Sequence, residues 1–424
     1  MVFNLPRGVQ DILPDEMPKW HLIEDTARTL FSTYNFSEIR TPIFENTHVF
    51  SRGMGQESDI FCKEMYNFKD RGGRELTLRP EGTAAVTRSS IMHALHKQMN
   101  PLKLYYIGPF FRYERPQAGR YRQFHQIGVE YIGESSAYVD AEVIGLGYRL
   151  FESLGISDLK VCINSVGCRL ARPVIEEMVK QFLGSNLDRF PPHIQHKFNS
   201  NPLRILDAKD DVVQACIAGM PDIKEVLTQE SKDHFFSVLQ HLDEMKIPYQ
   251  VTNTLVRGLD YYTETVFEIV SDYLGAQSTV CGGGRYNNLS KDLGGPDVPA
   301  FGFGFGIERT VMLLDHMKKS FSQSIDVYFI PLDMLSRNLL FYTMNQLRGY
   351  NISCEIGHKD QLKNQLKRAN RLNAKRVVIM GEDERNVKMV QYRDMLNHTQ
   401  NMVPADALIE IITNDFHINK LETP

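Results

Sequence analysis

Apolar and polar residues recur with two different periods in the first part of the chain, which predicts strands interspersed with a few amphipathic helices. Residues 18–31 carry apolar side chains at helical spacing, and the stretch 104–133 has the alternation of two strands joined by a polar loop at 115–120. A short strand at 37–41 is followed by a proline, as is common for edge strands. The same criteria predict strands at 75–79, 160–164, 265–270 and 300–306, and helices from about 84, at 139–154 and from 309.

The pattern changes twice further along the chain. Residues 170–249 are mostly helical with breaks at prolines, and they interrupt what otherwise reads as one mixed sheet. After a linker at 320–324, strands and helices alternate, which predicts a small α/β domain. A chain of 424 residues is expected to hold two or three domains. We therefore predict an α+β domain in two parts, 1–169 and 250–322, a helical insertion at 170–249, and a C-terminal α/β domain at 325–424.

Composition narrows the class of protein. The six cysteines are scattered without Cys-x-x-Cys spacing, so we expect reduced thiols in a cytosolic protein and no structural zinc. No apolar run reaches the length of a membrane span, and we recognise no signal or transit segment before Leu5. The expected location is the cytoplasm. A net charge of −4 neither favours nor excludes a nucleic-acid partner.

The paired strands within 104–133 carry the first candidate site. On the second strand Phe124, Gln126, Gly128 and Glu130 share one face with Arg122, and on the first strand Arg112 and Glu114 share a face. An arginine can form a bidentate contact with a phosphate, an aromatic ring can stack on a base, and a glycine leaves room for a substrate. The alternative is a half-exposed hairpin with surface salt bridges, and alternation alone does not decide between the two.

The letters F-R-x-E-R-P-Q-x-G-R-Y-R-Q-F-H-Q at 111–126 resemble motif 2 of class II aminoacyl-tRNA synthetases, in the form found in bacterial-type histidyl-tRNA synthetases. The resemblance implies that Arg112, Glu114 and Phe124 bind ATP and that Arg112 takes part in catalysis. It also implies that Gln117, in the loop, contacts the extra 5′ guanosine of tRNA(His).

The sequence R-P-E-G-T at 79–83 lies between a predicted strand and a predicted helix. A carboxylate at such a point is more often a helix cap than a ligand. The sequence is, however, similar to the amino-acid loop of the same family. The resemblance implies that Glu81 and Thr83 hold the substrate's α-amino group, with Gln126 and Glu130 completing the pocket, and that Gly82 also belongs to the histidine site.

Taken by itself, the sequence R-G-L-D-Y-Y at 257–262 is typical of a turn with an ion pair between its own arginine and aspartate. It resembles a signature specific to histidyl-tRNA synthetases. The resemblance implies that Arg257 is catalytic and approaches the substrate carboxylate and the α-phosphate, while Tyr261 and Tyr262 line the imidazole pocket. A hydroxyl that pairs with a ring N–H can reject other amino acids by ~10⁴–10⁵.

Two glycine-rich stretches follow. The run 281–286, C-G-G-G-R-Y, is by itself a bulge or loop, but it is similar to a second histidine-specific signature, from which Asn287 and Asn288 depart. At 300–309, A-F-G-F-G-F-G-I-E-R places three phenylalanines on one strand face and leaves the other bare, so that a flat ring could lie on the backbone. This stretch resembles motif 3, which implies that Arg309 binds the γ-phosphate and that adenine stacks between Phe124 and Arg309.

The C-terminal domain has a basic cluster. Lys363, Lys367 and Arg371 stand four residues apart, on one stripe of a predicted helix. Such a stripe is usually a solvated face, but its excess of cations in an acidic protein favours contact with a phosphate backbone. The domain resembles the class IIa anticodon-binding domain. Its predicted strands are 327–331, 352–355, 376–380 and 387–391, its helices 337–347, 361–372 and 405–412, and its cluster also includes Lys359, Arg368, Lys375 and Arg376 against Asp360.

The resemblance extends over essentially the whole chain. It implies a class II catalytic domain, formed by 1–169 and 250–322, that uses L-histidine, ATP with Mg²⁺ and tRNA(His), with no metal held by protein ligands alone. The helix at 18–31 and the strand at 37–41 resemble motif 1 and imply a homodimer. The alternatives are a non-catalytic regulatory subunit of ATP phosphoribosyltransferase and a tRNA-sensing module. Relatives of the first kind typically lack the C-terminal domain and the intact 257–262 signature.

Overall fold

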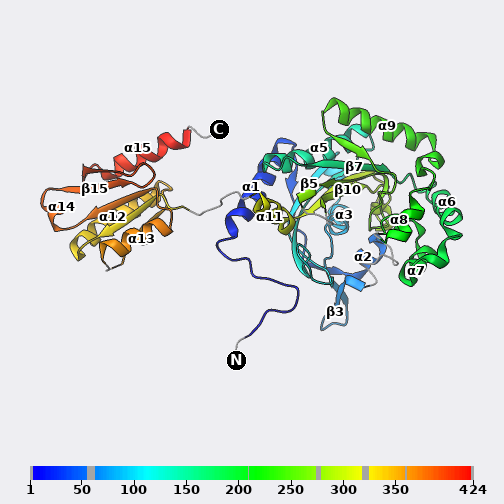
Figure 1. The fold of residues 1–424 in the computed structure, drawn as a ribbon, viewed down its shortest axis with the longest axis horizontal. Coiled ribbons are helices and arrows are strands. Elements are labelled where there is room, and N and C mark those ends of the chain that lie inside the picture. Colours follow the sequence, from blue (N-terminus) through cyan, green and yellow to red (C-terminus); the bar gives the residue numbers. More distant parts are fainter. Residues whose placement is uncertain are drawn as a thin grey trace. The chain divides into compact units, whose positions relative to one another are not determined.

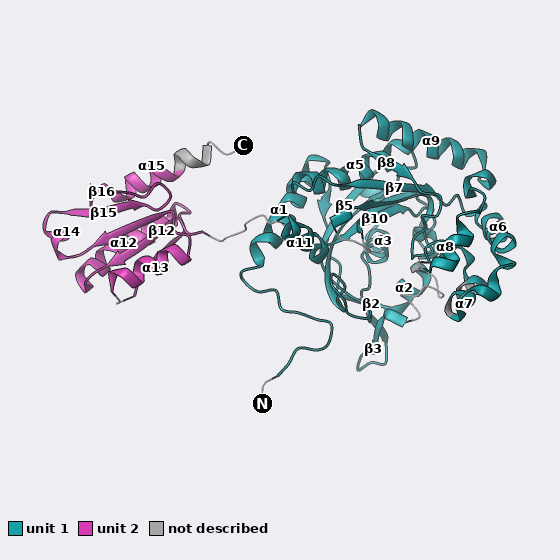
Figure 2. Cartoon of the chain, in the orientation of Figure 1, with its two compact units in different colours: residues 1–319 teal, residues 320–424 magenta. Residues whose placement is uncertain are grey.

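The chain forms two compact units, residues 1–319 and 320–424 (Figure 2). The computed structural model describes residues 3–54, 63–208, 210–273, 278–317, 324–358 and 361–421. Residues 320–323 of the predicted linker therefore lie outside the described residues, as do Cys62, Lys359 and Asp360.

Unit 1 is organised around an eight-stranded sheet with the order β1-β5-β6-β11-β10-β9-β7-β8. All pairs are antiparallel except the two at the edges, β1 with β5 and β7 with β8. Phe301, Phe303 and Phe305 are buried on one face of β11, as their alternation predicts. The strands are β1 (Ser37–Glu38), β5 (Leu102–Phe111), β6 (Gln123–Ile132), β7 (Lys160–Ser165), β8 (Tyr249–Val251), β9 (Thr263–Val270), β10 (Thr279–Arg285) and β11 (Ala300–Gly306).

Two details of this sheet differ from the sequence-based expectation. The hairpin strands end at Phe111 and resume at Gln123, so Arg112, Glu114 and Arg122 lie in the connection and not on the strands. The backbone N–H of Arg112 still donates to the carbonyl of Arg122 at 2.9 Å, because the ladder continues for one step beyond the strands. The glycine run 282–284 is part of a central strand, although its register with β9 is irregular at both ends.

Helices cover the sheet, and a small sheet stands beside it (Figure 1). The small sheet has the order β2-β4-β3 and leads from β4 through the loop 79–82 into α3. Phe151 of α5 packs edge-on against Phe305 of β11, with ring centroids 5.2 Å apart. These elements are β2 (Phe44–Asn46), β3 (Tyr66–Lys69), β4 (Glu75–Leu78), α1 (Met17–Thr33), α2 (Thr47–Met54), α3 (Thr83–Met92), α4 (Leu95–Gln98), α5 (Ala137–Ser153), α10 (Leu289–Asp292) and α11 (Ile307–His316).

The segment between β7 and β8 is helical, as predicted, and α6 to α8 lie together in green in Figure 1. Residues from 166 to 227 form an apolar core of their own, to which Val256 and Val266 of the sheet domain also belong. The last helix, α9, packs mainly on α5 instead. The segment consists of α6 (Arg172–Gly184), η2 (Leu187–Arg189), α7 (Pro192–Ser200), η3 (Pro202–Ile205), α8 (Asp211–Ile217), η4 (Ile223–Val226) and α9 (Gln229–Glu244).

Unit 2 is an α/β fold around a five-stranded sheet with the order β13-β12-β14-β15-β16. Strands β13, β12 and β14 are parallel to one another, β15 is antiparallel to β14, and β16 is antiparallel to β15. Short helix α14 and edge strand β16 were not predicted, and the last helix begins at Leu408, three residues later than expected. The elements are β12 (Val327–Pro331), α12 (Met334–Gly349), β13 (Cys354–Ile356), α13 (Leu362–Arg371), β14 (Arg376–Met380), α14 (Glu382–Asn386), β15 (Met389–Asp394), β16 (Thr399–Pro404) and α15 (Leu408–Leu421).

None of the helices in the described part of the chain combines the length and the apolar character needed to cross a membrane.

Candidate active site

Two cavities adjoin the middle of the main sheet. The larger, of about 590 Å³, is bordered by the hairpin connection, by β10 and β11, and by the start of α11. The smaller, of about 290 Å³, lies between the helical insertion and the loop 256–263. Arg257 lines both, so the predicted carboxylate-binding arginine stands where the two cavities meet.

The four residues predicted to bind ATP all line the larger cavity: Arg112, Glu114, Phe124 and Arg309. Arg112 is oriented by the bond from its Nε to the carbonyl oxygen of Pro80, at 2.9 Å, and its guanidinium carbon lies 5.3 Å from the centre of the Phe124 ring. Arg309 donates from Nη1 to the carbonyl oxygen of Thr279 at 2.6 Å. Burial and the nearby Arg120 lower the pKa of Arg309, as expected where cations gather.

The bare strand face predicted on β11 is present only in part. A Cβ atom added to Gly304 would have its nearest neighbouring atom 3.6 Å away, and one added to Gly306 would have it 4.0 Å away. The backbone at these two glycines is therefore open to a flat ligand. At Gly302 a Cβ atom would overlap the carboxylate of Glu130. The prediction that Gly128 leaves room for a substrate is wrong, because the ring of Tyr106 occupies that space.

Three residues of the predicted amino-group pocket, Glu81, Thr83 and Glu130, come together, but they line neither of the two cavities. Glu81 accepts hydrogen bonds from the backbone N–H groups of Thr83 at 2.6 Å and Ala84 at 2.9 Å, so it does cap the start of α3. The Thr83 hydroxyl donates to one carboxylate oxygen of Glu130 at 2.7 Å, and the hydroxyl of Tyr286 donates to the other. Gln126 lines the larger cavity.

Burial dominates the electrostatics of this pocket. Glu130 is 1% exposed, and burial raises its pKa to about 8 against the opposing hydrogen bonds from Tyr286 and Thr83. Burial also raises the pKa of Glu81, which is 4% exposed, although its backbone hydrogen bonds counteract part of this. A cation next to these two buried carboxyl groups would lower their pKa values and favour the ionised form. An ammonium group would therefore be stabilised by both carboxylates.

Arg257 is held by a partner that the sequence did not reveal. Its Nη1 contacts the carboxylate of Glu268 on β9, which also accepts a hydrogen bond from the Thr279 hydroxyl at 2.7 Å. Burial lowers the pKa of Arg257, but Glu268 and the neighbouring phenols outweigh it and leave the pKa raised, so the guanidinium is charged. A Cβ at Gly282 would overlap the guanidinium, which explains why β10 carries a glycine there.

Tyr261 and Tyr262 form an aromatic wall next to this pocket. Their ring centroids are 4.7 Å apart at an angle of 49°, and Tyr261 meets Tyr286 edge-on at 5.7 Å. Burial raises the pKa of Tyr261 and of Tyr262, so both hydroxyls stay protonated and can donate or accept a hydrogen bond.

Sequence reasoning missed the contributions of Tyr106, Glu268 and Tyr286. A signal existed for Tyr106, because it lies directly opposite Gly128 in the hairpin register and a large ring beside a bare glycine tends to cover it. The internal ion pair expected within R-G-L-D is absent, since Arg257 pairs with Glu268 while Asp260 pairs with arginines of the insertion.

The residues predicted to bind tRNA lie outside these cavities. Gln117 is exposed in the hairpin connection, where it bridges to Arg120. Lys363, Lys367 and Arg371 are exposed along α13 and have no ion-pair partner among the described residues. The rest of the cluster is largely neutralised, because Arg368 pairs with Glu355, Lys375 with Asp326 and Arg376 with Asp415, while Lys359 lies outside the described residues.

Comparison with known proteins decides the family. Residues 8–181 and 193–310 match the family model described as histidyl-tRNA synthetase. The histidine–tRNA ligase of Halothermothrix orenii is 45% identical over 413 residues, which cover 97% of this chain and 99% of that protein. The chain belongs to the histidyl-tRNA synthetase family.

Solved structures agree with the predicted fold class. The crystal structure of apo S. aureus histidyl-tRNA synthetase is 36% identical with a TM-score of 0.81, covering 97% of this chain and 100% of that one. The antiparallel sheet flanked by helices is therefore the α+β fold of class II synthetases, as predicted. A Bacillus halodurans protein described as an ATP phosphoribosyltransferase regulatory subunit/histidyl-tRNA synthetase shares the fold at 21% identity and a TM-score of 0.65, covering 89% of this chain and 98% of that one.

Proposed function

We infer that this chain is a histidine–tRNA ligase, which activates L-histidine with ATP to histidyl-adenylate and pyrophosphate and transfers histidine to the 3′ end of tRNA(His). The observation that carries the inference is the position of Arg257, which lines both the cavity of the predicted nucleotide residues and the cavity bordered by Tyr261 and Tyr262. Adenylation brings a carboxylate up to an α-phosphate, and a fixed cation at that point reduces the repulsion between them.

Each group then has a distinct task in adenylate formation. Glu81 and Glu130 hold the α-ammonium group, and Tyr261 and Tyr262 surround the imidazole. Phe124 stacks on adenine above the open backbone of Gly304 and Gly306. Three arginines supply positive charge at two points along the triphosphate. Arg112 and Arg257 stabilise the charge that develops on the α-phosphate, and Arg309 binds the leaving pyrophosphate.

No protein nucleophile is needed for this chemistry. The substrate carboxylate attacks the α-phosphorus and pyrophosphate leaves, so the protein acts by holding the two reactants in line and by supplying fixed charge. Arg112 and Arg309 are each oriented by a backbone carbonyl, and this preorganisation reduces the reorganisation needed during the reaction.

We propose that Mg²⁺ accompanies the ATP phosphates. Mg²⁺ bound with ATP is usually held by phosphate oxygens and water together with one or two carboxylates. Glu114 and Glu308 line the same cavity and would supply carboxylate oxygens. The bound ion would neutralise charge on the pyrophosphate.

The partners follow from the same proposal. Exposed Gln117 and the exposed cations of α13 are the proposed contacts with tRNA(His). We also propose a homodimer formed through α1 and β1, and a cytoplasmic location. Among the described strands β1 pairs with β5 and forms one edge of the main sheet, and an edge strand can pair with a strand of an identical subunit.

The activity is tested by ATP–pyrophosphate exchange with each of the twenty amino acids. We expect exchange with L-histidine alone, followed by aminoacylation of tRNA(His). The regulatory-subunit alternative, which the comparisons support less, predicts histidine binding without exchange. Exchange with a different amino acid, or none at all, would contradict the proposed function.

The raised pKa of Glu130 predicts a pH dependence of histidine binding. The pKa of about 8 in the empty pocket means that Glu130 is mainly protonated at neutral pH, whereas an ammonium ligand favours the carboxylate. Binding therefore releases a proton, and the KM for histidine should fall as pH rises toward about 8.

A kinetic pH profile from 6 to about 8.5 tests this, with Glu130→Gln as the matched control. The imidazole of histidine titrates in the lower part of this range in both enzymes. Only the wild type should show the further fall in the KM for histidine as the pH approaches about 8. Identical pH profiles for the two enzymes would show that Glu130 does not release a proton when histidine binds.

A further inference from the structure

The loop between β8 and β9 carries Arg257, Tyr261 and Tyr262 but has little structure of its own. Residues 252–262, all of which the structure describes, form neither helix nor strand. Within it, a Cβ added at Gly258 would have no neighbouring atom within 4 Å, so the space on that side of the chain is open. Something outside the loop must hold these side chains in position.

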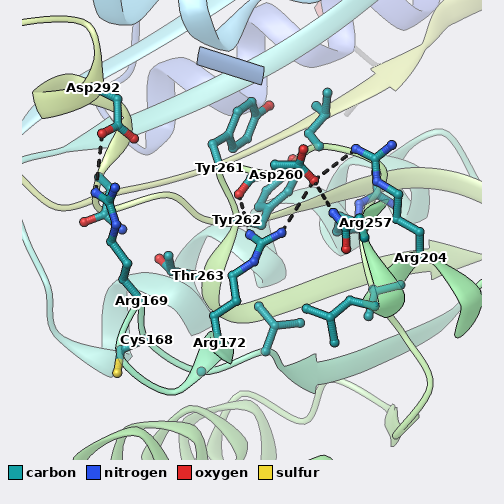
Figure 3. A pocket seen from close by; sticks show the side chains of 17 residues that line it. Cys168, Arg169, Arg172, Arg204, Arg257, Asp260, Tyr261, Tyr262, Thr263 and Asp292 are labelled. Atoms are coloured by element: carbon teal, nitrogen blue, oxygen red, sulfur yellow. Dashed lines mark hydrogen bonds and ion pairs between the residues drawn. The ribbon is translucent and has the colours of Figure 1, made fainter. Parts of the chain in front are cut away.

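The helical insertion supplies that restraint through Asp260. One carboxylate oxygen, Oδ1, accepts hydrogen bonds from Asn201 Nδ2 at 2.9 Å and Arg204 Nη2 at 3.0 Å, and lies 3.6 Å from Arg172 Nη2. Arg172 Nη1 also donates to the backbone carbonyl of Asp260 at 2.8 Å. Figure 3 shows the arginines reaching Asp260 from two directions, next to Tyr261 and Tyr262. We call Arg172, Asn201, Arg204 and Asp260 the Asp260 clamp.

Burial makes these contacts strong. The side chain of Arg204 is 11% exposed, that of Asp260 21%, and Asn201 is 7% exposed. Charge-assisted hydrogen bonds sheltered in this way are less weakened by water than surface ion pairs. All three partners come from α6 and η3, more than fifty residues earlier in the chain than Asp260.

Apolar packing also ties the same loop to the insertion. Tyr262 packs against the apolar core of the insertion, to which Val256 also belongs. The segment that supplies Asn201 and Arg204 continues to Asp207, which lines the larger cavity with the predicted nucleotide residues. Residues of the insertion therefore line both cavities that Arg257 borders.

We propose that Arg172, Asn201 and Arg204 are positioning residues for histidine, which through Asp260 hold Tyr261 and Tyr262 at the imidazole pocket. This inference rests on the proposed function and assigns to the insertion a direct effect on amino-acid recognition. All three line the same small cavity as Tyr261 and Tyr262, and the role proposed for them is to fix the loop, with the tyrosines making the contact with the imidazole. Loss of the positioning residues should let the loop sample other conformations, which weakens histidine binding and leaves ATP binding largely intact.

Steady-state exchange kinetics with the full-length enzyme test the proposal. Arg204→Ala should raise the KM for histidine by about tenfold, the usual effect of losing one charge-assisted hydrogen bond, while the KM for ATP stays within about twofold. Asp260→Asn keeps the shape of the side chain but weakens all its contacts in the Asp260 clamp. It should show the same pattern with a larger increase in the KM for histidine, and it replaces Arg204→Ala as the test if that variant does not fold. In the double variant the effects should not add, because both act through one contact.

Arg169→Ala is the matched control. It removes a guanidinium from the border of the same small cavity, where Arg169 pairs with Asp292 at 3.4 Å and does not contact Asp260 (Figure 3). Its KM for histidine should remain that of the wild type. Inhibition by L-histidinol, which lacks the carboxylate, should weaken in Arg204→Ala by the same factor as histidine binding, because the clamp acts on the tyrosines.

An unchanged KM for histidine in Arg204→Ala and Asp260→Asn, an equal rise in the Arg169→Ala control, or unchanged histidinol affinity would each overturn the proposal. Failure of the proposed function would look different, since wild-type protein would then show no histidine-dependent exchange at all.

Discussion

Arg257→Ala should lower the rate of histidine-dependent ATP–pyrophosphate exchange by about a thousandfold. The loss of one preorganised hydrogen-bond donor in a shielded site commonly lowers the rate by about 10²–10³, and Arg257 is proposed to contact two anionic groups. The substitution also leaves the carboxylate of Glu268 without its cation, facing the place where the α-phosphate would bind. Repulsion from that carboxylate adds to the loss.

The measurement is exchange at saturating ATP and histidine, with the melting temperature recorded to exclude unfolding. Arg257→Ala/Glu268→Gln separates the two contributions, since it removes the unpaired charge and should recover the part due to repulsion. Arg169→Ala serves again as a control for the loss of an arginine nearby. Near-normal exchange by Arg257→Ala would refute the proposed role of this residue.

Removing unit 2 should have the second large effect, on a different step. Deletion of the residues after Ser324 should leave adenylation within about tenfold of the full chain and reduce tRNA charging by more than about a hundredfold, because the cations proposed to hold the phosphate backbone are lost. Unit 2 is a compact unit with described apolar cores made of its own residues, which supports deleting it as a whole. An equal loss of both activities would show that unit 2 is not a separable tRNA-binding module.

A finer version of this experiment replaces only Lys363, Lys367 and Arg371 by alanine. If the three contact phosphates, the slope of log affinity for tRNA against log salt concentration should become less steep by about 2–3. Arg368→Ala is the matched control on the same helix, because Glu355 already neutralises that guanidinium at 2.7 Å. An unchanged slope in the triple variant would show that these three side chains do not contact phosphates of the tRNA.

The glycine–phenylalanine alternation at 300–306 shows how far local pattern can go. It predicted a strand with a packed face and a bare face, and β11 has the packed face in full and the bare face at Gly304 and Gly306, because side chains along a strand must alternate. The pattern did not predict that Glu130 would cover Gly302, nor that Tyr106 would fill the space at Gly128. Those contacts depend on which strand lies next in the sheet.

By itself the sequence determined most strands of the main sheet, the longer helices of unit 1, the helical character of the insertion and the α/β character of unit 2. Short-range periodicity and local motifs carry that information. Only the tertiary structure decided the partners within the site. Arg257 pairs with Glu268, Asp260 is held by the insertion, and Glu130 meets Tyr286 across 156 positions of the chain. Such partners are set by the packing of elements far apart in sequence, and no local pattern records that packing.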